Sequence, residues 1–218
     1  MFKDRTEAGK ILAKTLIKYK NDRVIILALP RGGVVIGYEV AKALNAPLDI
    51  IVTRKIGHPN NPEYAICAVD ENGLLLCNER EAKSVDQNWL KDEILQERKE
   101  ATRRVALYRG KRKPEEIAGK VAIIVDDGIA TGLTMRLAIR SVKNQNPKKI
   151  IVAVPVAPSD SINFIYEEGA DEIITIEPPE EFTGSVGAHY EQFEQVEDGE
   201  VISLLQKSYE AGSKNTNR

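Results

Sequence analysis

The stretch that decides the fold runs from residue 121 to residue 134 and reads Val-Ala-Ile-Ile-Val-Asp-Asp-Gly-Ile-Ala-Thr-Gly-Leu-Thr. Its first five residues are apolar and mostly β-branched, which is typical of a strand buried on both faces of a parallel sheet. Two acids end this strand, and apolar residues then recur at helical spacing: Met135, Ala138, Ile139 and Val142. The order of strand, acidic loop and helix predicts a loop at the carboxyl end of a parallel strand, where open α/β sheets bind their ligands.

The turn after the acids has the composition of an anion-binding site. A helix that begins with Thr131, Gly132 and Thr134 presents hydroxyls and free backbone N–H groups at the positive end of its dipole. Asp126 and Asp127 could not bind a phosphate, but they could accept hydrogen bonds from sugar hydroxyls or hold Mg²⁺ through water. Together the two halves predict a site for a phosphorylated sugar.

Residues 125–132 resemble the phosphoribosyl-pyrophosphate (PRPP) motif of the type I phosphoribosyltransferases. This resemblance implies that the paired acids hold the ribose 2′- and 3′-hydroxyls and that the loop wraps the 5′-phosphate. The implied PRPP-binding residues of the motif are Asp126, Asp127, Gly128, Ile129, Ala130, Thr131, Gly132, Leu133 and Thr134. It also implies transfer of the phosphoribosyl group to a nitrogen acceptor, with Mg²⁺ bound mainly through the diphosphate and ribose of PRPP. The plain alternative is an ordinary crossover that happens to end in Asp-Asp-Gly.

A second candidate site follows the first predicted strand, residues 24–29. Arg31, Gly32 and Gly33 come directly after Pro30, and two glycines in a tight turn let backbone N–H groups approach an anion closely. The family resemblance assigns this place to the pyrophosphate loop, where an unusual peptide geometry commonly points amides at the diphosphate. Arg-Gly-Gly alone more often marks a plain turn, but its position after the first strand favours the PRPP site.

Residues 53–64 show no periodicity and are predicted to form a long loop. Arg54 and Lys55 at its root resemble the basic start of the flexible catalytic loop of this family, which closes over the diphosphate. The catalytic residues implied by the resemblance are therefore Arg54 and Lys55, which would carry the departing diphosphate, and Asp126 and Asp127, which would support positive charge on the sugar. The alternative for Arg54 and Lys55 is a solvated basic turn.

The alternation of strands and helices predicts a doubly wound parallel sheet with right-handed crossovers, and a hairpin at its edge that turns at Asn72-Gly73. Residues 1–176 are expected to form this core, including the flexible loop 53–64. One long amphipathic helix is predicted over 79–110, and it is a candidate contact in an expected homodimer. Residues 177–218 are expected to form a hood, a short helix over 199–209 and a disordered tail over 211–218.

The hood segment, residues 177–198, contains aromatic and turn-forming residues without periodicity. In the family that the motif resembles, a hood recognises the acceptor base, and aromatic faces stack well on planar heterocycles. Phe182, Val186 and Tyr190 are therefore the candidate acceptor-binding residues, although they could equally bury the tail against the core. Enzymes of this family that act on 6-oxopurines generally carry a third acid where this chain has Ala130. The expected acceptor is thus a nucleobase other than a 6-oxopurine.

Composition narrows the class of protein further. The 218 residues carry a net charge of −2, with a pI near 5.9, which argues against a bulk nucleic-acid binder. No apolar run approaches the roughly 20 residues that a membrane helix requires, and the charged N-terminus lacks a signal peptide, so a cytoplasmic location is expected. Cys67 and Cys77 are predicted to be reduced core residues, and with two histidines in the chain a zinc site is not expected.

Two other functions use similar motifs. A non-catalytic PRPP-binding regulator would lack turnover, but the Arg54-Lys55 pair favours catalysis. Only one predicted helix precedes the first strand, which is too little for a helix-turn-helix. A PRPP synthetase-like diphosphokinase would share the acidic motif, but the chain has no duplicated domain and no Walker-type loop.

Overall fold

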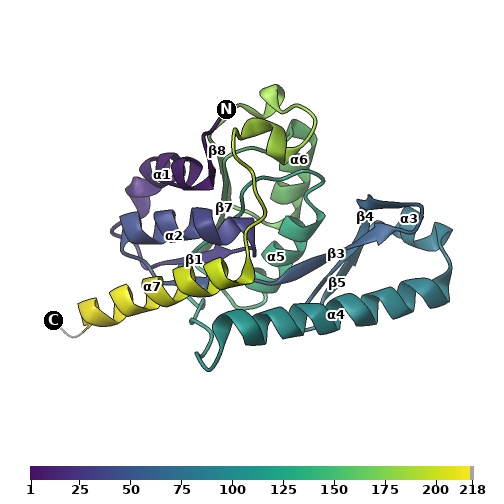
Figure 1. Ribbon diagram of the computed structural model, residues 1–218, viewed down its shortest axis with the longest axis horizontal. Coiled ribbons are helices and arrows are strands. Elements are labelled where there is room, and N and C mark those ends of the chain that lie inside the picture. Colours follow the sequence, from purple (N-terminus) through teal and green to yellow (C-terminus); the bar gives the residue numbers. More distant parts are fainter. Residues whose placement is uncertain (217–218) are drawn as a thin grey trace.

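The computed structural model describes residues 1–216 (Figure 1). Its centre is a five-stranded parallel sheet with the order β2-β1-β6-β7-β8. The strands are β1 (Val24–Ala28), β2 (Leu48–Ile50), β6 (Val121–Val125), β7 (Lys149–Val154) and β8 (Glu172–Thr175). Every residue of β1 and β6 is buried, as their unbroken apolar sequences predict. The predicted parallel α/β sheet is confirmed.

Helices cover both faces of this sheet because successive strand residues point to opposite sides. Ile26 of β1 packs in one apolar cluster, together with residues of α1 (Arg5–Leu16), α2 (Gly32–Leu44) and α7 (Asp198–Thr216). Its neighbour Leu27 packs in a second cluster with α5 (Leu133–Lys143) and α6 (Ser159–Glu168). Figure 1 shows the first three helices grouped apart from α5 and α6. The sheet is therefore doubly wound, as expected.

A second, antiparallel sheet has the order β3-β4-β5, with β3 (Thr53–His58), β4 (Asn61–Asp70) and β5 (Leu75–Cys77). The prediction of an irregular loop over residues 53–64 is wrong, because most of this segment belongs to β3 and β4. Shifts in register around Gly57 break the two-residue alternation that normally reveals a strand. The predicted hairpin with its turn at Asn72-Gly73 is confirmed.

The segment 79–110 forms two helices, α3 (Glu79–Ser84) and α4 (Gln87–Arg109), so the prediction of one continuous helix is wrong. Val85 is extended, and the Asp86 side chain accepts a hydrogen bond from the Trp89 N–H at 2.8 Å. Asp86 thus starts a new helix as its N-cap, and helix capping by Asp competes with continuation of the preceding helix.

Cys67 and Cys77 form a disulfide, so the prediction of two reduced thiols is wrong. They lie directly opposite each other in the β4–β5 ladder, with their Cα atoms 4.0 Å apart. Their spacing in the sequence does not reveal this, because only the hairpin register brings the two side chains together. Disulfides are uncommon in reducing compartments, so this pair counts against the expected cytoplasmic location.

The C-terminal helix α7 continues to Thr216, whereas the sequence predicts an end near Tyr209 and a disordered tail over 211–218. The tail prediction is therefore wrong for residues 211–216, and residues 217–218 lie outside the described part. Three short 3₁₀ helices occupy Ile17–Tyr19, Pro179–Glu181 and Val186–His189. Within residues 1–216, no helix combines the length and apolar character needed to span a bilayer.

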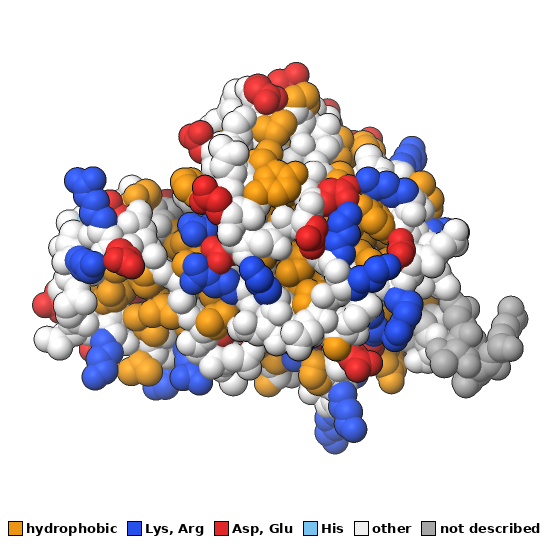
Figure 2. Space-filling view, turned by 180° about the vertical axis from the view of Figure 1, so that it is seen from behind, with side chains coloured by type: hydrophobic (Ala, Val, Ile, Leu, Met, Phe, Trp, Pro, Cys, Tyr) orange, Lys and Arg blue, Asp and Glu red, His pale blue; other side chains and the backbone are white. Residues whose placement is uncertain are grey.

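Acidic and basic side chains are interspersed on the face of the molecule shown in Figure 2, without a continuous stripe of one sign. This arrangement agrees with the nearly balanced charge of the sequence. An extended basic surface of the kind that binds nucleic acids is not present on that face.

Candidate active site

The acidic loop lies at the carboxyl end of β6, as predicted. Asp126 and Asp127 follow the strand directly, and α5 begins at Leu133 after Gly132, whose φ of 77° favours glycine. The loop is held from outside the motif: the Ile129 N–H donates to the carbonyl of Val156 at 2.9 Å. The Ser161 hydroxyl on α6 donates to the carbonyl of Ala130 at 2.7 Å. Thr131 is exposed, so the predicted phosphate loop is open to solvent.

The glycine turn at the start of α2 packs against the two acids. A Cβ atom added at Gly32 would lie 1.9 Å from Oδ2 of Asp127, and one added at Gly33 would lie 3.0 Å from Oδ1 of Asp126. Only glycine permits this approach without displacement of a carboxylate. The Pro30–Arg31 peptide bond is cis, which matches the unusual peptide geometry expected here. The structure therefore brings the two candidate loops together.

The two carboxylates lie in a partly buried, hydrogen-bonded setting. Oδ1 of Asp126 accepts a hydrogen bond from the Asp127 N–H at 2.8 Å, and Oδ2 of Asp127 accepts one from Nε of Arg5 at 2.6 Å. Burial raises the pKa of Asp126 well above its usual value, and the charge of Asp127 raises it further. Burial also raises the pKa of Asp127, against the opposing effect of Arg5. Within residues 1–216, no backbone N–H or basic side chain donates to Oδ2 of Asp126 or Oδ1 of Asp127, although the two carboxyl groups also interact with each other. These two oxygens are the acceptors left for a ligand.

Two contacts at this site are not indicated by the sequence. Arg5, on the first turn of α1, forms the ion pair with Asp127 across 122 residues. The Tyr190 hydroxyl donates to the carbonyl of Asp127 at 2.6 Å, whereas the sequence predicts Tyr190 only as an acceptor-binding residue. Nothing in residue spacing indicates these contacts, since both depend on how the N-terminal segment and the hood fold over the sheet.

The three hood residues predicted to bind an acceptor make contacts within the protein. A Cβ atom at Gly128 would lie 2.5 Å from Val186, so the hood packs tightly on the motif. Phe182 stacks on His189, with ring centroids 5.1 Å apart. Tyr190 is 5 % exposed and packs against Phe2 and Phe193, so its ring has no open face for a planar ligand in this structure. The acceptor role of Phe182, Val186 and Tyr190 stays a prediction.

Arg54 and Lys55 are not joined to the acidic loop by any hydrogen bond or ion pair among residues 1–216. Nε of Arg54 contacts Oε2 of Glu97 on α4 at 2.6 Å, and Nζ of Lys55 contacts Oε2 of Glu63 at 2.8 Å. Arg54 also lines a surface hollow of about 690 Å³ along α4. Arg54 and Lys55 are therefore paired with acids of α4 and β4. Contact of either side chain with a diphosphate would require its ion pair with Glu97 or Glu63 to break.

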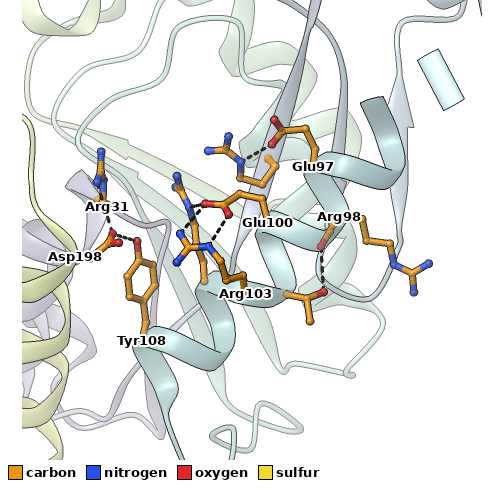
Figure 3. Close-up of polar contacts among 10 residues, drawn as sticks. Arg31, Glu97, Arg98, Glu100, Arg103, Tyr108 and Asp198 are labelled. Carbon is orange, nitrogen blue, oxygen red and sulfur yellow. Dashed lines mark hydrogen bonds and ion pairs between the residues drawn. The ribbon is translucent and has the colours of Figure 1, made fainter. Parts of the chain in front are cut away.

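Arg31 in the glycine turn is held by a small polar network (Figure 3). It lies 3.6 Å from Oδ1 of Asp198 at the start of α7, and the Tyr108 hydroxyl on α4 donates to the same oxygen at 2.5 Å. Burial and the neighbouring carboxylate raise the pKa of Tyr108 to about 12, so it remains a donor at neutral pH. The network links α2, α4 and α7.

The motif residues line none of four surface hollows of 250 to 690 Å³. One of these lies between α2 and α7, and a second lies at the amino ends of the strands. The acidic loop reaches solvent outside these four hollows, since the side chain of Asp127 is 16 % exposed and Thr131 is exposed.

Comparisons with known proteins point to one family for most of the chain. Residues 4–190 match the family model described as "Phosphoribosyl transferase domain". A Mycobacterium tuberculosis H37Rv protein named "Putative phosphoribosyl transferase" is 36 % identical over 211 residues, which are 96 % of this chain and 47 % of that protein. The chain thus spans about half the length of the curated relatives it matches. A uracil phosphoribosyltransferase from Mycoplasma genitalium is 42 % identical over 55 residues, which are 25 % of this chain and 27 % of that protein.

Among solved structures, the crystal structure of the protein TT1426 from Thermus thermophilus is similar along nearly its whole length. It is 36 % identical in sequence, with a TM-score of 0.77, and the match covers 95 % of this chain and 98 % of that one.

Proposed function

Since the chain belongs to the phosphoribosyl transferase domain family, we propose that it transfers the 5-phosphoribosyl group of PRPP to a nitrogen acceptor and releases diphosphate. The observation that carries this proposal is the close packing of two loops at the carboxyl end of β6. There, adjacent carboxylates, each with one oxygen that accepts no hydrogen bond from a backbone N–H or a basic side chain, meet a glycine turn that begins a helix. A sugar that carries both hydroxyls and phosphates matches this pair of features.

In the proposed reaction, the bond from ribose C1 to diphosphate breaks and a bond from C1 to the acceptor nitrogen forms. Asp126 and Asp127 would bind the ribose hydroxyls and support the positive charge that develops on the sugar. The loop 129–134 would hold the 5′-phosphate through backbone N–H groups of residues 130–134, since the Ile129 N–H already donates to the carbonyl of Val156. Arg31, Gly32 and Gly33 would bind the diphosphate. The protein would act by positioning and charge stabilisation, so no nucleophilic side chain is required.

The residues present fit a magnesium ion that arrives with PRPP. Within the described chain, no group of three or more His, Cys, Asp or Glu side chains could hold a metal by itself. The free oxygens of Asp126 and Asp127 are hard donors of the kind that Mg²⁺ prefers through water. Bound to the diphosphate, Mg²⁺ would neutralise the charge of the leaving group.

The proposed acceptor is a nucleobase other than a 6-oxopurine. Ala130 stands where the 6-oxopurine enzymes of this family generally carry an acid. The carbonyl of Ala130 accepts a hydrogen bond from the Ser161 hydroxyl, which fixes the backbone at this position. The short match to a uracil phosphoribosyltransferase agrees with such an acceptor but covers a quarter of the chain. A homodimer and a cytoplasmic location stay proposals, and the Cys67–Cys77 disulfide is the observation that argues against the second of them.

The proposed function is tested by release of diphosphate from PRPP and Mg²⁺ in the presence of individual nucleobases and small amines. We expect one class of acceptor to give release that depends on both the acceptor and Mg²⁺. PRPP binding by calorimetry without release for any acceptor would favour a regulator that senses PRPP. The ion pairs that hold Arg54 and Lys55 away from the motif are the observation that favours this second function. Absence of PRPP binding would contradict both functions.

The variant Arg54→Ala is expected to bind PRPP normally and to lower turnover about 100-fold, since a guanidinium that reaches the diphosphate only during reaction contributes only to the transition state. Calorimetry with PRPP and steady-state diphosphate release measure the two effects. Lys83→Ala is the matched control, because it removes an exposed cation paired to Glu79 on α3. An equal loss of binding and turnover in Arg54→Ala would place Arg54 in the resting PRPP site.

A further inference from the structure

Arg5 is held by three groups at once. Nε donates to Oδ2 of Asp127 at 2.6 Å, and Nη1 donates to the carbonyl of Glu194 at 2.7 Å. The guanidinium also lies 3.8 Å from the centre of the Phe193 ring, a cation–π contact. Its side chain is 12 % exposed, so these contacts are shielded from water. A side chain with this many contacts has one orientation and imposes it on Asp127.

The N-terminal segment that carries Arg5 is hydrogen-bonded to the hood before Arg5 and begins α1 at Arg5. The Phe2 N–H donates to the carbonyl of His189 at 2.8 Å, and the Gln192 N–H donates to the carbonyl of Lys3 at 2.9 Å. Asp4 then caps α1 through the Glu7 N–H at 2.8 Å. The N-terminal segment and the hood thus form one unit, and Arg5 joins that unit to the acidic loop.

Arg5 is also the cation that offsets the charge of the two acids. Among residues 1–216, no other Lys or Arg forms an ion pair with Asp126 or Asp127. Its bond to Oδ2 of Asp127 lies on the same side as the Gly32 turn, since a Cβ at Gly32 would lie 2.9 Å from Nε of Arg5. Oδ1 of Asp127 and Oδ2 of Asp126 therefore remain available as hydrogen-bond acceptors.

We propose that Arg5 is a positioning residue for ribose recognition: it fixes Asp127 so that one oxygen of each acid stays available to the two ribose hydroxyls. This inference rests on the proposed PRPP site and extends it to a residue outside the motif. Arg5 does not touch the substrate and acts through Asp127. A lysine could not replace it fully, because the planar guanidinium bonds Asp127 and Glu194 with two separate N–H groups.

The test compares three ligands that share parts of PRPP. Calorimetry measures binding of PRPP with Mg²⁺, of ribose 5-phosphate and of inorganic diphosphate to the wild type, Arg5→Gln and Arg5→Lys. We expect Arg5→Gln to bind PRPP and ribose 5-phosphate about 10- to 100-fold more weakly, the range for loss of a charged hydrogen bond, and to bind diphosphate as the wild type does. Arg5→Lys should be intermediate for the two ribose ligands. Lys10→Gln, an exposed cation on the same helix, is the control and should bind all three ligands normally.

Each other outcome has a definite meaning. Unchanged PRPP binding by Arg5→Gln would overturn the inference and leave the proposed function intact. Equal weakening for all three ligands, diphosphate included, would show a merely structural role, and so would unfolding of Arg5→Lys in a thermal melt. Failure of the wild type to bind PRPP would overturn the proposed function itself and with it the role of Arg5.

Discussion

The double variant Asp126→Asn/Asp127→Asn is expected to lose PRPP binding, with affinity at least about 1000-fold below that of the wild type. Two charge-assisted hydrogen bonds to ribose hydroxyls would be replaced by weaker neutral ones. Where the amide NH₂ group takes the place of a carboxylate oxygen, it would face the hydroxyl hydrogen as a second donor, and no hydrogen bond would form. Calorimetry with PRPP and Mg²⁺ measures the effect. Unchanged affinity would refute the role of these acids in ribose binding.

The single variant Asp126→Asn should lose affinity yet gain stability at pH 7. The pKa of Asp126 is raised in the folded state, so its stabilising contribution is complete below the unfolded pKa of about 4 and is lost as the pH rises through the folded value. Asparagine does not titrate, and its oxygen can still accept the hydrogen bond from the Asp127 N–H. We expect a gain in stability at pH 7, because the neutral amide avoids the cost of a buried charge.

Thermal unfolding between pH 4 and pH 8 measures this gain. The melting temperature of the wild type should fall relative to that of Asp126→Asn as the pH rises, by about 2–4 °C for each kcal/mol of lost stability in a chain of this size. Asp127→Asn is the control: it leaves the Arg5 guanidinium without its carboxylate, so it should not share the gain. A wild type that stays more stable than Asp126→Asn at pH 7 would contradict the raised pKa.

The variant Gly32→Ala is expected to lower both stability and PRPP affinity. The new methyl carbon would lie 1.9 Å from Oδ2 of Asp127 and 2.9 Å from Nε of Arg5, so the carboxylate and the guanidinium must separate or α2 must shift. Overpacking of this kind costs about 1–3 kcal/mol, and displacement of Asp127 should weaken PRPP binding more than about 10-fold. Urea unfolding and calorimetry measure the two effects.

Gly199→Ala is the matched control for this variant. Gly199 is exposed in the first turn of α7, and no atom lies within 4 Å of a Cβ built there. Alanine at such a position should be neutral or stabilise the protein by about 0.5 kcal/mol, because it restricts the unfolded chain. Normal PRPP binding by Gly32→Ala would show that the close contact between the two loops is not part of the site.

Local patterns in the sequence were sufficient to predict the parallel sheet and the placement of its candidate site. The apolar run of β6, the two acids and the start of α5 are contiguous, so the period of the pattern and the turn residues specify them directly. The same holds for the hairpin turn at Asn72-Gly73. Irregular segments are harder to predict from local patterns. The register shifts near Gly57 break the alternation that would indicate β3, and the N-cap at Asp86 divides the predicted long helix into α3 and α4.

Partners that are distant in the sequence were decided by the tertiary structure alone. Arg5 meets Asp127, Arg54 meets Glu97, and Cys67 meets Cys77 because packing and strand register bring their backbones together. A hydrophobic period reports which side of an element is buried, but it does not report which polar side chain of another element lies opposite. The sequence by itself therefore determined the sheet and the acidic loop, whereas the residues that orient its carboxylates follow from how the N-terminal segment and the hood fold over that loop.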